Sequence, residues 1–230
     1  MRNLSLSAIA ALALTMTPAL AATVVVDSIT GTWDNVTGAT VSGAGTDTIS
    51  WGTSTGEGQS QYVFDATAVP ITDPTSPFQL GTFTHNNNPI FPPSITGAEL
   101  TVSVSGNVDG NAFTIGGTYA FSHNETTNSA PCFEGSVSVC DDIVTLLGAT
   151  EFDGSVIVDG EEFFFALTGF EGGASFFTQE GQSNSAALFA GFTTNPVVVN
   201  PVPLPAGAIL LGTGIAAFGV WSRKNKRKAA

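Results

Sequence analysis

The sequence predicts an all-β protein whose main part is a single antiparallel β-sandwich or jelly-roll-like domain. Three observations lead to this prediction. Apolar and polar residues alternate with period two along much of the chain, turn signals separate many short candidate strands, and no segment between residues 23 and 200 has a convincing helical period. After removal of the ends about 180 residues remain, enough for one core. We expect a signal helix before this domain and a transmembrane helix after it.

Residues 1–21 have the three zones of a secretory signal peptide. Arg2 precedes an apolar run from Leu4 to Met16, and small residues lead to an Ala-Leu-Ala sequence ending at Ala21. Signal peptidase cleaves after patterns of this Ala-x-Ala kind. We therefore expect cleavage after Ala21 and export of the remaining chain.

Residues 22–194 are expected to form the β-sandwich, with two hairpins as its clearest elements. Residues 99–105 and 113–122 alternate on either side of a turn at 107–111. Residues 155–158 and 161–165 flank an Asp-Gly pair that tolerates the positive φ values of a type I′ turn. The other candidate strands are residues 23–29, 36–41, 47–51, 61–65, 78–84, 136–140, 174–178 and 186–193.

The C-terminal region predicts a membrane-spanning segment on a stalk. Residues 195–203 form a Pro-rich linker, and residues 204–221 are apolar or small throughout. Eighteen helical residues reach about 27 Å, close to the hydrocarbon thickness of a bilayer. The basic tail at 223–228 carries five positive charges, which should hold this end in the cytoplasm. The domain before it should therefore face outward.

Charge is distributed very unevenly along the chain. All six Lys and Arg lie at position 2 or within 223–228, whereas all 19 Asp and Glu lie between Asp27 and Glu180. With neutral histidines, the region between the two ends therefore carries a formal charge of −19. Such a region cannot neutralise phosphates, which excludes nucleic-acid binding. Its stability must come from apolar burial, backbone hydrogen bonds and any bound cations.

The two cysteines, Cys132 and Cys140, are expected to form a local disulfide. They lie in the exported region, where disulfides persist. Neither a Cys-x-x-Cys pair nor a His-rich partner segment is present to indicate metal or redox chemistry. Closing so small a loop should stabilise the fold by about 2.5 kcal/mol.

A short motif lies where the Pro-rich linker meets the apolar segment. It consists of Val202, Pro203, Leu204, Pro205 and Ala206. Together with the apolar helix and the basic tail, it resembles the VPLPA variant of the PEP-CTERM sorting signal, here spanning residues 202–230. The resemblance implies recognition by an exosortase-type membrane protease, transient anchoring in the inner membrane, and removal or exchange of the tail. The destination that it implies is the cell surface or the extracellular polymer.

The domain also resembles the THxN family of PEP-CTERM-type proteins. The motif that names the family is present as Thr84, His85, Asn86 and Asn87. Further matching pieces are residues 33–36, 51–52, 123–126, 140–144 and 177–180. This resemblance implies a compartment and carries no reaction with it.

Two histidines are the strongest candidates for chemistry. His85 and His123 each stand in a (Thr/Ser)-His-Asn triplet, and in a β domain they could meet and bind a metal with Glu125. A metal-dependent hydrolase is therefore one alternative. The interpretation that we favour is that each His packs at a strand end beside a turn. Because no Cys/His catalytic pair is plausible once the two cysteines are bridged, we expect no enzyme and no catalytic residue.

Calcium is an alternative to an entirely cofactor-free domain. Two groups of acids can each present several oxygens to this hard cation, although neither matches an EF-hand loop. The groups are Asp141 and Asp142 beside the disulfide, or Asp153, Asp159, Glu161 and Glu162 near the second hairpin.

The sequence thus predicts a structural or adhesive protein of the cell surface or exopolysaccharide matrix. Its expected partners are signal peptidase, the sorting protease, the membrane before processing, and exopolysaccharide. A sugar-binding module is the main alternative, with Trp33, Trp51 and Tyr62 as stacking surfaces.

Overall fold

The computed structural model describes residues 22–194 except 75, 76, 127, 129, 133–135, 138 and 139. The expected signal peptide, Pro-rich linker, sorting motif and C-terminal apolar helix lie outside these residues. Within the described part of the chain, no helix has the length and apolarity needed to cross a membrane.

Fifteen strands make up the described structure, in two large sheets and one small one. The first large sheet contains β1 (Val24–Thr37), β6 (Ile71–Thr72), β9 (Gly97–Val108), β10 (Asn111–Asn124), β11 (Asp142–Asp153) and β14 (Ser175–Thr178). The second contains β2 (Val41–Ser42), β3 (Thr48–Trp51), β5 (Ser60–Ala66), β7 (Phe78–Asn87), β12 (Val156–Val158), β13 (Glu161–Phe170) and β15 (Gln182–Thr193). The small sheet pairs β4 (Thr53–Ser54) with β8 (Ile90–Phe91).

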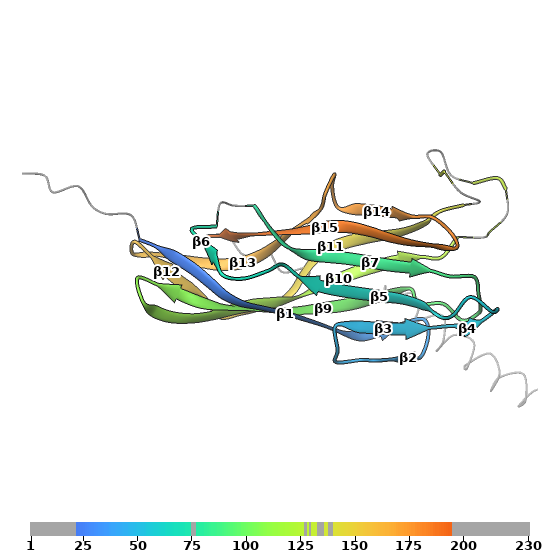
Figure 1. Cartoon of the computed structure of the whole chain (residues 1–230), viewed down its shortest axis with the longest axis horizontal. Coiled ribbons are helices and arrows are strands. Elements are labelled where there is room, and N and C mark those ends of the chain that lie inside the picture. Colours follow the sequence, from blue (N-terminus) through green and yellow to red (C-terminus); the bar gives the residue numbers. More distant parts are fainter. Residues whose placement is uncertain are drawn as a thin grey trace, which may run out of the picture.

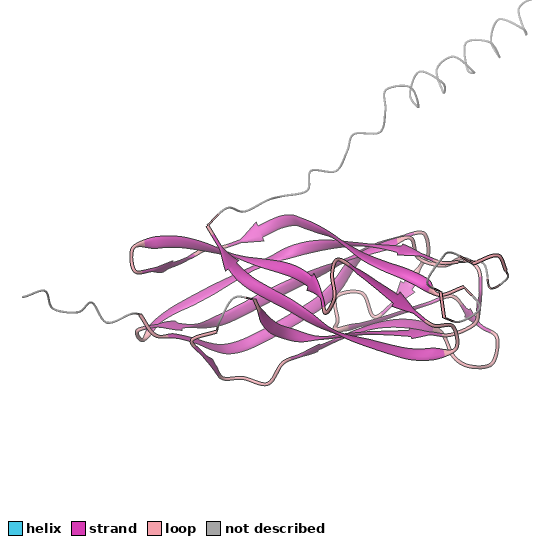
Figure 2. Cartoon of the chain, turned by 90° about the horizontal axis from the view of Figure 1, so that it is seen from above, coloured by secondary structure: helices cyan, strands magenta, loops and turns pink. Residues whose placement is uncertain are grey.

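The two large sheets are strongly curled, like two half-barrels, and pack against each other along the long axis of the molecule (Figure 1). Their strand orders are β14-β11-β10-β9-β1-β6 and β12-β13-β15-β7-β5-β3-β2, and every pairing is antiparallel. Seen from above, strands cross obliquely (Figure 2). The all-β antiparallel prediction is confirmed at this level.

Both predicted hairpins are present. In β9–β10, Val108 pairs with Asn111 across Asp109 and Gly110, whose φ angles are 50° and 82°. In β12–β13, Val158 pairs with Glu161 across another Asp-Gly pair with φ angles of 52° and 82°. Positive φ at both central residues is what a type I′ turn requires, and Gly at the second position adopts it without strain.

The strand prediction was wrong in two respects, a break within β1 and a strand at residues 136–140. Residues 23–29 and 36–41 were expected to be separate strands, but β1 is continuous to Thr37 because two register shifts, at Val26/Ser28 and Asp34/Thr37, absorb the break in alternation. Residues 136–140 were expected to be a strand, yet residues 136, 137 and 140 lie in none. The strand begins at Asp142 instead, and register shifts along β10–β11 interrupt the alternation that would have revealed it.

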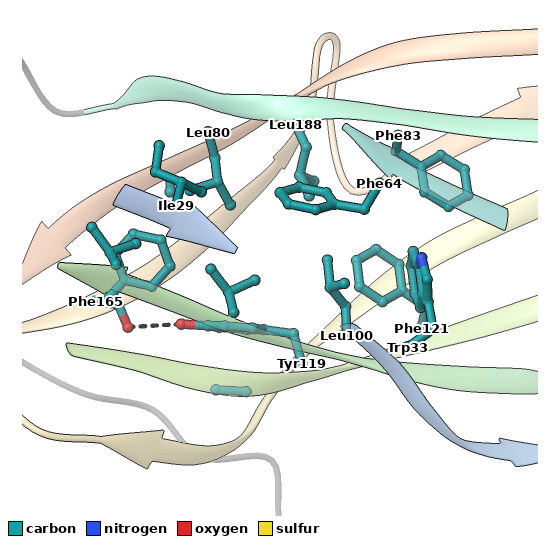
Figure 3. Packing of buried hydrophobic residues seen from close by; sticks show 14 of the residues in the cluster. Ile29, Trp33, Phe64, Leu80, Phe83, Leu100, Tyr119, Phe121, Phe165 and Leu188 are labelled. Carbon is teal, nitrogen blue, oxygen red and sulfur yellow. Dashed lines mark hydrogen bonds between the residues drawn. The ribbon is translucent and has the colours of Figure 1, made fainter. Parts of the chain in front are cut away.

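The core lies between the two sheets. Leu80, Leu188 and Phe64 of the seven-stranded sheet face Leu100 and Tyr119 of the six-stranded sheet, and all five are at most 2% exposed (Figure 3). Burying each such side chain stabilises the fold by roughly 1.5–3 kcal/mol. Apolar contact between the sheets is therefore the main force that holds them together.

A candidate metal centre between the sheets

The two histidines meet in the interior of the sandwich. His85 lies near the end of β7 in the seven-stranded sheet, and His123 lies near the end of β10 in the six-stranded sheet. Their ring centroids are 5.2 Å apart with the planes nearly perpendicular, at 83°. They are 0% and 5% exposed. The fold thus brings the two histidines together, which the sequence analysis had considered only as an alternative.

Asp142, the first residue of β11, joins the two rings. It is fully buried, and His85, His123 and Asp142 each offer one ligand atom within 4.8 Å of those of the other two. The Nε2 atom of His123 lies 3.9 Å from the Oδ2 atom of Asp142. Two imidazoles and one carboxylate therefore converge from both sheets.

Two further carboxylates border this group. Glu125 follows β10, and its Oε2 atom lies 3.4 Å from Nε2 of His123. Glu180, between β14 and β15, forms a second group with Glu125 and Asp142 in which one oxygen of each lies within 4.8 Å of the others. Five potential ligands thus surround a single region, with Asp142 common to both groups.

The Nδ1 atom of each histidine is hydrogen-bonded to a neutral hydroxyl group. The Nδ1 atom of His85 forms a 2.8 Å hydrogen bond with Oγ1 of Thr178, and Nδ1 of His123 forms a 2.6 Å bond with the hydroxyl of Tyr62. The Nε2 atom of His85 is buried and has no hydrogen-bond partner among the described residues. His123 consequently turns Nε2 toward Glu125 and Asp142, while Nε2 of His85 is left without a hydrogen bond.

Aromatic rings enclose the histidines. Trp51 stacks on His85 at 5.6 Å and 22°, and its edge contact with His123 is also 5.6 Å. Its indole Nε1 donates to Oγ of Ser94, which donates in turn to Glu125 at 2.6 Å. Trp51 therefore both shields the centre and orients one of its carboxylates.

This placement corrects the expected sugar-stacking surface. Trp33, Trp51 and Tyr62 are all 0% exposed. Their rings contact one another and the core, with Trp33 and Tyr62 5.3 Å apart and Trp51 and Tyr62 4.9 Å apart. A sugar cannot stack on faces that other side chains already cover, so these three residues do not form a stacking platform.

Burial shifts the ionisation of the carboxylic acids. It raises the pKa of Asp142 to about 7, with a further rise from the charge of Glu125 and partial relief from the Thr126 amide that donates to Oδ1. Burial also raises the pKa of Glu180, assisted by Glu125. Burial alone would raise the pKa of Glu125 too, but hydrogen bonds from His123 and Ser94 lower it overall.

The neighbouring His85 and Tyr62 are held neutral. Burial lowers the pKa of His85 well below its ordinary value, and the proximity of His123 lowers it further. Burial raises the pKa of Tyr62, with smaller contributions from Asp142 and Glu125. A neutral imidazole is the form that binds a metal.

The disulfide lies next to the centre. Cys132 and Cys140 are joined with an S–S distance of 2.06 Å and a Cα–Cα distance of 4.8 Å. Cys140 comes two residues before Asp142, and Thr126 bonds to both: its hydroxyl donates to the carbonyl of Cys140, and its amide donates to Oδ1 of Asp142 at 2.8 Å. Thr126 thus connects Cys140 of the disulfide with the buried carboxylate of Asp142.

The two calcium candidates have different outcomes. Of the first candidate, Asp142 belongs to the centre together with His85 and His123. Asp141 instead accepts a hydrogen bond from the amide of Val137. In the second candidate, Asp153, Asp159, Glu161 and Glu162 are exposed, and they belong to neither potential metal group found among the described residues. The second candidate therefore has no geometric support.

The Thr-His-Asn-Asn motif divides between the two faces of β7. Thr84 and Asn86 bond to neighbouring strands, through Ser185 and Gln61 respectively. His85 and Asn87 point inward and are fully buried, and Asn87 donates to the carbonyl of Thr178. Strand alternation places the His of the motif at the centre.

Asp142 and Glu180 are the members that sequence reasoning did not associate with the histidines. Their positions follow from pairing between strands far apart in the chain: Asp142 pairs with Thr178, two residues before Glu180. The repeated (Thr/Ser)-His-Asn triplet was the available signal for the histidines, and nothing comparable marks the acids.

A scan against protein-family models and a search of curated proteins find no match to this chain.

Proposed function

We propose that this protein is an exported component of the cell surface or extracellular matrix with a structural or adhesive role. The observation that carries the structural role is the enclosure of its polar centre. The ligand groups of His85, His123 and Asp142 are at most 5% exposed and join two sheets. A catalytic metal site keeps one position open to substrate, whereas a structural site is closed by the protein.

Export is supported by the distribution of charge. The 19 acidic residues lie between Asp27 and Glu180, whereas every Lys and Arg lies at position 2 or within 223–228. Removal of a signal peptide and a sorting tail would leave a wholly acidic protein, which remains soluble by mutual repulsion. The resemblance to THxN-family proteins and to the VPLPA sorting signal supports the same destination and implies an exosortase-type protease.

The test of export is the C-terminus of the natural protein. Cells and medium are fractionated, and the chain is isolated from each fraction for mass spectrometry. We expect a terminus near residues 202–206 and a surface or medium location. An intact Ala230 in the inner membrane would contradict processing.

The test of the structural role compares adhesion with turnover. Deleting the gene should weaken attachment to the matrix, and restoring the wild-type chain should rescue it. A variant with Thr101→Val, on the exposed face of β9, serves as the control and should rescue equally. The purified chain is also tested for hydrolysis of the matrix polymer. Hydrolysis that is required for rescue would overturn the proposal in favour of an enzyme.

A further inference from the structure

The carboxylates at the centre have no Lys or Arg to balance their charge, and the ion pairs of Glu125 and Asp142 are with His123, which is charged only when protonated. Glu125, Asp142 and Glu180 bring three carboxylates within 4.8 Å of one another. No Lys or Arg exists anywhere between residues 3 and 222 to oppose them. Buried carboxylates are strongly destabilising unless a cation or protons compensate them. This arrangement therefore favours an ion that carries at least two positive charges.

Two buried polar atoms of this group of potential ligands have no hydrogen bond. The Nε2 atom of His85 and the Oδ2 atom of Asp142 have no hydrogen bond among the described residues, and both side chains are 0% exposed. Buried polar atoms in native proteins are almost always satisfied, so unpaired ones indicate a bound ion or water. The unpaired nitrogen of His85 is independent of the charge count, and His85 belongs to the same group of potential ligands as Asp142.

The outer hydrogen bonds prepare the rings for coordination. If Nε2 of each histidine is the ligand atom, each Nδ1 carries the proton and donates, to Thr178 from His85 and to Tyr62 from His123. The Thr178 hydroxyl can then donate to the carbonyl of Asp142. Metal-binding histidines are typically oriented by such a donated second hydrogen bond.

The spacing suits a small tetrahedral ion. Ligands about 2.0–2.1 Å from a tetrahedral zinc ion are separated by about 3.3–3.5 Å. The Nε2 atom of His123 lies 3.4 Å from Oε2 of Glu125 and 3.9 Å from Oδ2 of Asp142. The Glu125 oxygen is already at the required separation from His123, and the Asp142 oxygen is about 0.4 Å beyond it.

We propose that His85, His123, Asp142 and Glu125 form a binding site for a divalent transition metal of the zinc class, which clamps the two sheets together. The mixed nitrogen and oxygen ligands select this class, because calcium and magnesium prefer oxygen ligands alone. Glu180 lies beside the site and contributes negative charge. The clamp goes beyond the proposed surface role, and its failure would leave export and sorting untouched.

The first experiment measures metal binding by the full wild-type chain. The protein is stripped with EDTA, dialysed, and titrated separately with ZnCl₂, CaCl₂ and MgCl₂ in a calorimeter, with parallel thermal unfolding. We expect one zinc ion per chain and a rise in Tm of about 5–10 °C when free zinc is about a hundredfold above Kd. Calcium and magnesium should give no comparable shift. The proposal is overturned if zinc neither binds nor raises Tm, or if calcium reproduces its effect.

The second experiment identifies the coordination. Cobalt(II) chloride added to the stripped chain should give the intense visible absorption bands of a tetrahedral ion, and zinc should remove them by competition. Bands as weak as those of the hydrated ion would show that cobalt sits on surface acids, and would refute the buried site.

The third experiment assigns the ligands. Glu125→Gln removes the partly exposed ligand and should weaken zinc binding by at least about tenfold. Glu151→Gln makes the same change on the exposed face of β11 and should leave zinc affinity unchanged. His85→Gln should abolish the cobalt bands. Since this buried variant could fail to fold, its circular dichroism is compared with that of stripped wild type, and the Glu125→Gln result stands without it. Equal losses in Glu125→Gln and Glu151→Gln would overturn the assignment.

Discussion

A buried hydrogen bond of Tyr119 crosses the gap between the two sheets. The hydroxyl of Tyr119 on β10 donates to the carbonyl of Phe165 on β13 at 2.8 Å (Figure 3). Tyr119 is 1% exposed, and burial raises its pKa far above the ordinary tyrosine value, so the donor stays protonated. A single atom thus links the sheets away from the polar centre.

Replacing Tyr119 by Phe tests this link. The change leaves the Phe165 carbonyl buried without its donor, and we expect the free energy of unfolding to fall by about 1–2 kcal/mol. Urea denaturation of the full chain measures it. Thr101→Val also removes a hydroxyl, from an exposed pair with Thr118, and should cost less than about 0.5 kcal/mol. Equal effects of the two changes would show that the cross-sheet bond contributes little.

At the scale of elements, strand β9 depends on close backbone approach to β1. Gly106 pairs with Val26 next to a register shift, and a Cβ atom added there would lie 1.9 Å from the carbonyl oxygen of Val25. Real Cβ atoms do not approach backbone so closely, so the two strands would have to separate. The φ angle of Gly106 is not in the left-handed region, so other residues could adopt this backbone conformation. The glycine is required because there is no space for a Cβ atom.

Gly106→Ala should therefore lower the free energy of unfolding by about 1–3 kcal/mol, as overpacked cores do. Ser103→Ala, three residues earlier on the same strand, is the control and should change it by less than about 0.5 kcal/mol. Chemical denaturation of both variants gives the comparison. An unchanged midpoint for Gly106→Ala would mean that β1 and β9 move apart at little cost.

The loop that precedes β11 gives a second element-scale prediction. The Cys132–Cys140 disulfide closes it two residues before Asp142. Changing both cysteines to Ser should reduce stability by about 2.5 kcal/mol through loop entropy. Because Thr126 connects the carbonyl of Cys140 with the carboxylate of Asp142, zinc affinity should also fall. Calorimetry on the double variant measures the zinc affinity. An unchanged affinity would show that the disulfide does not contribute to zinc binding at the centre.

With neutral histidines, the described part of the molecule carries charge of one sign only. The described part contains no Lys or Arg, and the only ion pairs found among its residues involve His123, with Glu125 and Asp142. Self-repulsion between surface acids destabilises the compact state and is screened by salt. The curled sheets must therefore hold together against this repulsion.

Raising NaCl from about 0.01 M to about 0.5 M, which shortens the screening length several-fold, should consequently raise Tm. Thermal unfolding of the zinc-loaded chain measures the effect, so that ion binding at the centre stays constant. CaCl₂ at the same ionic strength should raise Tm by a similar amount. A much larger effect of CaCl₂ would reveal a separate calcium site, and a fall in Tm with NaCl would refute the repulsion.

Much of the fold followed from local pattern. The β9–β10 and β12–β13 hairpins were predicted because alternation and turn residues are properties of adjacent segments. Strand β11 was missed, since bulges shift its register and its neighbours are distant in the chain. The disulfide-closed loop was mistaken for a strand because Val137 stands in a run of alternating residues, although its amide bonds to the Asp141 carboxylate.

By itself, the sequence determined the all-β class, the hairpins, the acidic character of the domain and the expectation of export, because these depend on composition and short-range periodicity. Only the tertiary structure decided that His85 and His123 meet, that Asp142 joins them, and that Trp51 and Tyr62 enclose the centre. The physical reason is that these groups come from both sheets and are brought together by pairings between segments far apart in the chain. Local residue patterns do not encode which strands will pair or which buried atoms will face each other.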